Sequence, residues 1–202
     1  MAKNNKILIA PLLIRITHIV NAIAIIIMIM SGLRIYNASP IFNFYIADFL
    51  TLGGWLAGAL LWHFAFMWLL VANGLIYLIY NFATNRFKMK FFPITINNLI
   101  NDAYAAATGR LNHTNLEKYN SIQKLAYLSI MLDTVLLVVS GLAIWKSVQF
   151  PILRTLMGGY DSARIIHFCA MLYAVFFIIV HLIMAFKVPQ TLLIMTIGKK
   201  ND

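Results

Sequence analysis

Four long runs of apolar residues divide the chain, and shorter stretches between them contain most of the charged residues. The runs cover approximately residues 11–33, 55–80, 124–145 and 165–187. A helix needs about 20 predominantly apolar residues to cross the hydrocarbon core of a membrane, and each run meets this length. The pattern therefore predicts an all-α membrane protein, a four-transmembrane-helix bundle that forms a single domain over residues 1–202.

The composition supports this class and excludes others. Hydrophobic residues make up 62% of the chain and charged residues 11%, whereas soluble domains contain about 25% charged residues. Soluble enzymes, disordered tails and secreted disulfide scaffolds are excluded. The single cysteine, Cys169, forms no intrachain disulfide, and the absence of a C-x-x-C-H motif excludes a covalently attached c-type haem.

The net charge of +10 arises from basic residues that flank the apolar runs, which indicates membrane topology rather than nucleic-acid binding. Most of the 16 basic residues belong to the two ends of the chain and to the connection 81–123. The positive-inside rule therefore predicts that both termini and this connection are cytoplasmic, in a bacterial inner membrane. Arg15 and His18 lie within the first run and no cleavage site follows it, so this run is predicted to be a permanent helix rather than a signal peptide.

The connections are expected to contain some structure. Residues 40–54 are apolar and aromatic and are expected to lie along the outer membrane face. A short helix is expected near Ile94 to Thr108 in the cytoplasmic connection, and Gly158-Gly159 predicts a turn in the outer connection 148–161. No internal repeat is identified.

Four of the five histidines lie inside the predicted spans, and His113 lies in the cytoplasmic connection. Ionisable groups within a membrane are costly and usually mark function. The topology sorts the four into two depths. His18 and His181 are near the cytoplasmic surface, and His63 and His167 are near the outer surface.

His167 and His181 are 14 residues apart in the fourth span. This spacing corresponds to a rise of about 21 Å and a rotation difference of about 40°, so both face the same bundle interior at different depths. Two imidazoles from facing helices can supply the axial ligands of a haem iron, whereas zinc would require more protein ligands. The sequence therefore predicts two b haems, held by His63 with His167 and by His18 with His181. Four polar contacts between helices remain the alternative.

Haem propionates favour water or cations, so nearby arginines are candidate contacts. Arg34, Arg154 and Arg164 are candidates on the outer side, and Arg15 on the inner side. Arg164 lies three residues before His167 and shares its helix face.

The chain resembles the bacterial four-helix di-haem cytochrome b family, which includes cytochrome b561 and the b-type subunits of membrane hydrogenases, formate dehydrogenases and thiosulfate reductases. It is most similar to subunits that are paired with molybdopterin oxidoreductases. The matching segments span almost the whole chain and are RITH (15–18), SGLRIYN (31–37), WHF (62–64), KYNSIQK (118–124), SGLAIW (140–145) and ARIIH (163–167).

This resemblance implies electron transfer between a periplasmic redox partner and the quinone pool, with no catalytic residue in this chain itself. It implies the same two histidine pairs and a quinone contact at Asn120, beside His181. Ile122 departs from the glycine of the family segment. The chain is accordingly expected to be an electron-transfer subunit of a quinone-linked oxidoreductase complex rather than a complete enzyme.

Two further questions stay open on the sequence. Asp133 lies within the third span, where it could relay protons for quinone chemistry or form a structural hydrogen bond to another helix. A stand-alone superoxide:quinone oxidoreductase of the cytochrome b561 type is the alternative function. A haem-free transporter is disfavoured because no pair of spans broken by glycine or proline is evident.

Overall fold

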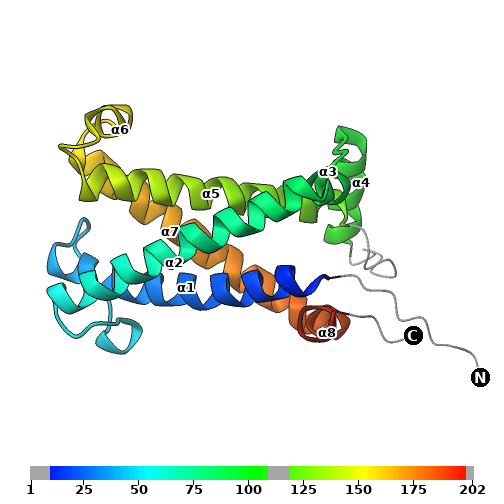
Figure 1. The fold of residues 1–202 in the computed structure, drawn as a ribbon, viewed down its shortest axis with the longest axis horizontal. Coiled ribbons are helices and arrows are strands. Elements are labelled where there is room, and N and C mark those ends of the chain that lie inside the picture. Colours follow the sequence, from blue (N-terminus) through cyan, green and yellow to red (C-terminus); the bar gives the residue numbers. More distant parts are fainter. Residues whose placement is uncertain (1–9, 109–118, 199–202) are drawn as a thin grey trace, which may run out of the picture. The chain divides into compact units, whose positions relative to one another are not determined.

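The computed structural model describes residues 10–108 and 119–198, and every regular element within these ranges is a helix (Figure 1). Four helices are long: α1 (Leu12–Ala38), α2 (Leu56–Ala83), α5 (Ser121–Trp145) and α7 (Tyr160–Lys187). The short elements are η1 (Asp48–Leu50), α3 (Arg86–Phe91), α4 (Ile96–Ala107), α6 (Pro151–Leu156) and α8 (Pro189–Ile197). His113 and the basic residues Lys3, Lys6, Lys199 and Lys200 lie outside the described residues, and the predicted orientation stays a prediction.

All four long helices are apolar and long enough to cross a membrane, in agreement with the four predicted spans. With 25 to 28 residues each, they are longer than the hydrocarbon core requires. The largest differences are that α1 continues to Ala38 and α7 begins at Tyr160. Hydropathy marks only the apolar part of a helix, whereas the backbone hydrogen bonds continue into its polar ends.

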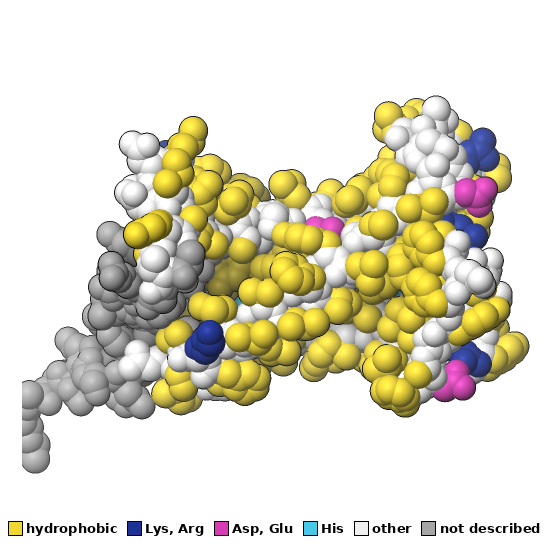
Figure 2. All heavy atoms as spheres, turned by 180° about the vertical axis from the view of Figure 1, so that it is seen from behind, with side chains coloured by type: hydrophobic (Ala, Val, Ile, Leu, Met, Phe, Trp, Pro, Cys, Tyr) yellow, Lys and Arg dark blue, Asp and Glu magenta, His cyan; other side chains and the backbone are white. Residues whose placement is uncertain are grey.

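The long helices carry large apolar side chains on their outer surfaces and small or polar ones inside. On α1, the isoleucines at positions 16, 19, 23 and 26 are about half exposed, whereas Thr17 and Ser31 are buried. Hydrophobic side chains cover most of the face seen in Figure 2. Lipid tails satisfy such a surface, and small or polar residues then form the contacts between helices.

The chain divides into two compact units, each of which contains a part of all four long helices. Unit 1 comprises the described residues of 1–15, 78–133 and 174–202, and unit 2 comprises residues 16–77 and 134–173. The predicted single domain stays a prediction.

In unit 2, a buried amide connects α1 to α2. The Nδ2 atom of Asn73 donates to the carbonyl of Thr17 at 2.8 Å and to Oδ1 of Asn21 at 2.6 Å. Polar side chains that pair between helices stabilise packing within a membrane because no water is available to pair with them.

The connection between α1 and α2, also in unit 2, is attached to the end of α1. Tyr36 donates its hydroxyl to the carbonyls of Phe42 and Phe44. Asn37 forms two hydrogen bonds with the backbone of Ile46, at 2.8 and 2.9 Å. This apolar segment therefore has a defined fold built on the last turns of α1.

In unit 1, the connection between α2 and α5 contains α4, which confirms the short helix expected near residues 94–108. Thr95 caps α4 by accepting from the backbone N–H of Asn98. Asp102 of α4 in turn accepts from the backbone N–H of Ser121 at 2.7 Å, so α4 is attached to the start of α5. The short helices α3 and α8 were not predicted.

We expect Asn73→Ala to destabilise the protein, because it removes two hydrogen bonds between α1 and α2. The expected loss is about 0.6–2 kcal/mol, the range for polar contacts between membrane helices, measured by thermal unfolding in detergent. Leu75→Ala is the matched control on the same helix, since the Leu75 side chain is 54% exposed. An equal loss in both variants would contradict a role for the amide.

Candidate functional site

Two of the four predicted ligand histidines lie together in unit 2. His63 of α2 and His167 of α7 have ring centroids 6.3 Å apart, and their ring planes are inclined at 65°. These residues are 104 positions apart in the sequence. The structure thus brings together the pair that the sequence analysis assigned to the outer site.

Each of these imidazoles contacts a buried serine on another helix. The Oγ atom of Ser31, on α1, lies 3.1 Å from Nδ1 of His63. The Oγ atom of Ser140, on α5, lies 2.9 Å from Nδ1 of His167. Both serines are completely buried, so all four long helices contribute one side chain to the site.

A glycine follows each serine and allows the imidazole to lie close to the helix backbone. A Cβ atom added to Gly32 would lie 3.4 Å from Cε1 of His63. A Cβ atom added to Gly141 would lie 3.3 Å from Cε1 of His167. The contact at Gly141 is tight and the one at Gly32 is close to an ordinary van der Waals distance, so each ring lies directly against the neighbouring helix.

The geometry fits a metal that is bound by two imidazoles. Two imidazoles that bind one metal from opposite sides, by bonds of about 2 Å, place their ring centres about 6 Å apart, since each ring nitrogen lies about 1 Å from its ring centre. The observed 6.3 Å agrees with this value. Within the described residues no group of three or more His, Cys, Asp or Glu side chains could hold a metal. The pair therefore suits an iron whose other ligands come from a porphyrin.

The other two histidines lie in different units. His18 is on the part of α1 in unit 2, and His181 is on the part of α7 in unit 1. The His181 ring stacks on Phe177 with centroids 5.8 Å apart and meets the edge of Tyr127 at 6.4 Å. Their pairing around a second haem stays a prediction.

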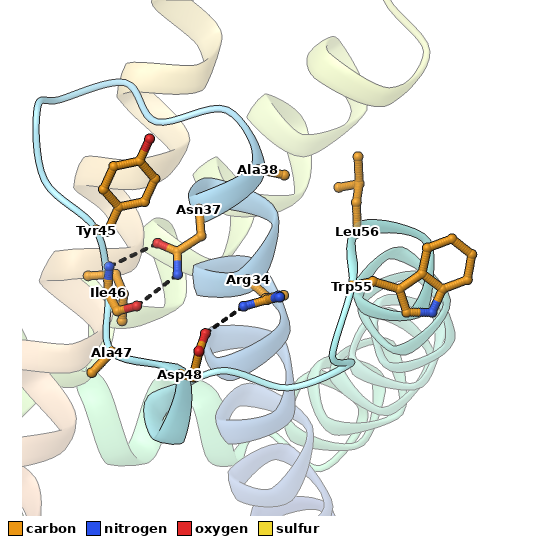
Figure 3. Close-up of a pocket in the computed structure, with 9 residues that line it drawn as sticks. All are labelled: Arg34, Asn37, Ala38, Tyr45, Ile46, Ala47, Asp48, Trp55 and Leu56. Carbon is orange, nitrogen blue, oxygen red and sulfur yellow. Dashed lines mark hydrogen bonds and ion pairs between the residues drawn. The ribbon is translucent and has the colours of Figure 1, made fainter.

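Three of the four arginines expected near haem propionates have partners within the protein. Arg34 forms an ion pair with Asp48 at 2.6 Å, at the edge of a cavity of about 500 Å³ between α1 and the following connection (Figure 3). Arg164 donates to the carbonyl of Ser39, and Arg15 donates to the carbonyl of Thr196. The ion pair of Arg34 with Asp48 is exposed and contributes little stability. Propionate contacts stay predictions for all of these arginines.

Asn120, the predicted quinone contact, caps the N-terminus of α5. Its Oδ1 accepts from the backbone N–H of Gln123 at 2.8 Å, and Gln123 accepts from the backbone N–H of Asn120. The adjacent Tyr119 contacts Tyr127, which contacts His181. Tyr119, the residue before Asn120, and His181 therefore belong to one aromatic cluster in unit 1. Burial raises the pKa of Tyr119, while the charge of Arg86 opposes this shift.

Asp133 is buried in α5, with 8% of its surface exposed. Its Oδ2 atom has no hydrogen-bond partner within the described part of the chain. A carboxylate in such a place is costly unless it is protonated or paired. This arrangement leaves both interpretations of Asp133 open.

The sequence analysis missed Ser31, Gly32, Ser140 and Gly141 as parts of the site. The signal was present, because the tripeptide Ser-Gly-Leu occurs at 31–33 and again at 140–142. Both copies lie in segments that carry the family resemblance, but their repetition was not identified from the sequence. The structure shows that both copies occupy equivalent positions beside a histidine.

Comparison with known proteins places this geometry in a family. The family profile described as prokaryotic cytochrome b561 matches residues 10–198. A protein of Azospira oryzae named as the YedZ1 subunit of a protein-methionine-sulfoxide reductase is 50% identical over 188 residues. The alignment covers 93% of this chain and 95% of that protein. No solved structure matches the chain.

We expect Gly141→Ala to weaken cofactor binding, because the added methyl group would press on His167. Overpacking of this kind costs about 1–3 kcal/mol, which the haem content of the purified protein would report. Gly74→Ala is the matched control within α2, since its added Cβ meets nothing within 4 Å. Unchanged haem content in Gly141→Ala would show that the close approach is not required.

Proposed function

This chain belongs to the prokaryotic cytochrome b561 family, whose members bind b-type haem, and from this we propose that it is a di-haem electron-transfer subunit. It links the quinone pool to a periplasmic molybdopterin oxidoreductase. Bound haem supplies reversible one-electron chemistry, and the polypeptide supplies its ligands and surroundings. The relative is named as a reductase subunit, and a reductase consumes electrons, so we infer flow from quinol to the partner.

The observation that carries this proposal is the arrangement of His63 and His167. Their 6.3 Å centroid separation suits two axial ligands on one iron. Both Nδ1 atoms face serine oxygens, which leaves Nε2 of each ring for the metal. We assign the outer haem to these residues.

The inner site is assigned from the sequence, with His18 and His181 as its ligands. The cluster of Tyr127 and Phe177 around His181 supplies flat apolar surfaces of the kind that a quinone ring packs against. Asn120 lies in the same unit and is the proposed quinone contact. Arg34 and Arg164 remain the proposed propionate contacts at the outer haem.

The orientation follows from the charges at the helix ends. Lys187 and the basic residues of the connection 81–123 lie on one side of the spans, with both termini. The positive-inside rule makes this side cytoplasmic in a bacterial inner membrane. His63 and His167 then lie on the periplasmic side, where the partner would dock.

Each ligand histidine is expected to be necessary for one haem of two. His63→Ala and His167→Ala should each lower the haem content from two to one per polypeptide, and His18→Ala should remove the other haem. His113→Ala, outside the spans, is the control and should retain both. Haem quantification with reduced-minus-oxidised spectra would measure this.

Two results would oppose the proposal. A folded wild-type protein without haem would remove the electron-transfer function. Superoxide-dependent quinone reduction by the isolated chain, without a copurifying molybdenum protein, would favour the stand-alone oxidoreductase.

Asp133→Asn tests the proton-relay interpretation. If the carboxyl transfers protons during quinol oxidation, the variant should slow haem reduction by a quinol at least tenfold and leave the haem spectra unchanged. Rapid-mixing kinetics would measure the rate. An unchanged rate would assign Asp133 a structural role.

A further inference from the structure

We propose that Ser31 and Ser140 are positioning residues that fix the tautomer and the ring orientation of the two axial histidines at the outer haem. The proposal rests on the proposed function in one respect, that His63 and His167 hold this haem. The serines contact the imidazoles and would act on the haem only through them.

The direction of each hydrogen bond follows from the number of available protons. A serine has one hydroxyl proton. The Oγ atom of Ser31 lies 2.7 Å from the carbonyl oxygen of Ile27, and the Oγ atom of Ser140 lies 2.6 Å from that of Leu136. A carbonyl oxygen can only accept, so each serine donates its proton to its own helix.

Each Oγ atom can then only accept from the facing imidazole. The proton of His63 and that of His167 must therefore be on Nδ1, which leaves the Nε2 lone pair directed away from the serine. The opposite tautomer would place a proton on the metal-binding nitrogen and would leave a short contact between two acceptors. The backbone carbonyls of Met28 and Leu137 also accept from His63 and His167. The serine oxygens and these carbonyls together select the tautomer that leaves Nε2 free for iron.

The acceptor is a neutral hydroxyl, whereas metal-bound histidines often donate to a carboxylate. A carboxylate in the membrane interior would carry a large desolvation cost. The serine avoids this cost and still increases electron donation by the imidazole, because its proton is already shared with a carbonyl. We infer that this interaction lowers the reduction potential of the outer haem.

The Ser-Gly pairs at 31–32 and 140–141 also fix the orientation of the two ring planes. Each imidazole is held at Nδ1 by a serine, and its Cε1 side lies against the neighbouring glycine. With both rings restrained in this way, their planes are inclined at 65°. Crossed axial imidazoles give low-spin ferric haem a strongly anisotropic electron paramagnetic resonance spectrum, whereas parallel imidazoles give a rhombic one.

The test compares threonine with valine at each serine, because these side chains have nearly the same shape and differ in the hydroxyl. Ser31→Val and Ser140→Val should each raise the potential of the outer haem and shift its resonance spectrum. Ser31→Thr and Ser140→Thr should remain close to wild type in both measurements. Ser129→Ala, on the same helix as Ser140, is the control and should leave the potential unchanged.

Equal potentials and equal spectra in the valine and threonine variants would overturn the proposal. If the valine variants lose the outer haem and the threonine variants retain it, the hydroxyl is required and the proposal stands. If none of these variants can be purified with haem, the wild-type spectrum decides between the outcomes. A strongly anisotropic signal supports the restrained crossed rings, and a rhombic signal contradicts them.

Failure of this inference is distinguishable from failure of the proposed function. If His63→Ala removes the outer haem but Ser140→Val leaves its potential and spectrum unchanged, only the role of the serines is wrong. If His63→Ala retains both haems, the ligand assignment itself is wrong.

Discussion

The pairing of the imidazole Nδ1 groups inside the membrane is the interaction on which the site depends. The hydrocarbon core contains no water to pair with an N–H group, so each buried histidine needs a partner from the protein. Ser31 and Ser140 supply it from neighbouring helices. These contacts set which helices must approach one another in unit 2, and the adjacent glycines set how closely the rings approach the backbone.

The repetition of this arrangement constrains both the sequence and the fold. The Ser-Gly pair of α1 faces the histidine of α2, and the Ser-Gly pair of α5 faces the histidine of α7. Each pair uses the same hydrogen bonds to its own helix, to the carbonyls four residues earlier. Two helix pairs of similar design therefore present two similarly held imidazoles to one position.

Hydropathy was sufficient to predict the four long helices, because membrane spans are recognised by length and apolar composition alone. The pairing of His63 with His167 followed from depth and helical rotation. The contacts of Ser31, Gly32, Ser140 and Gly141 with the histidines could not be predicted from the sequence. Serine and glycine are common in membrane helices, and only the structure shows which of them face an imidazole ring. Arg34 was expected to meet a propionate, but no span pattern could reveal its ion pair with Asp48, which depends on the fold of the connection.

The apolar side chains face outward and the neutral polar side chains pair between helices. This arrangement explains why the fold needs few charged residues. A chain that offers neutral histidines and serines can hold a redox centre without placing carboxylates beside it, which avoids most of the desolvation cost of ionic groups in lipid. Asp133 departs from this pattern, since one of its oxygens has no partner within the described residues. Because neutral hydroxyls are sufficient as partners of His63 and His167, the buried carboxyl of Asp133 requires a reason of its own. Proton transfer during the proposed quinol oxidation is a role that a carboxyl can perform and that the hydroxyls of Ser31 and Ser140 cannot.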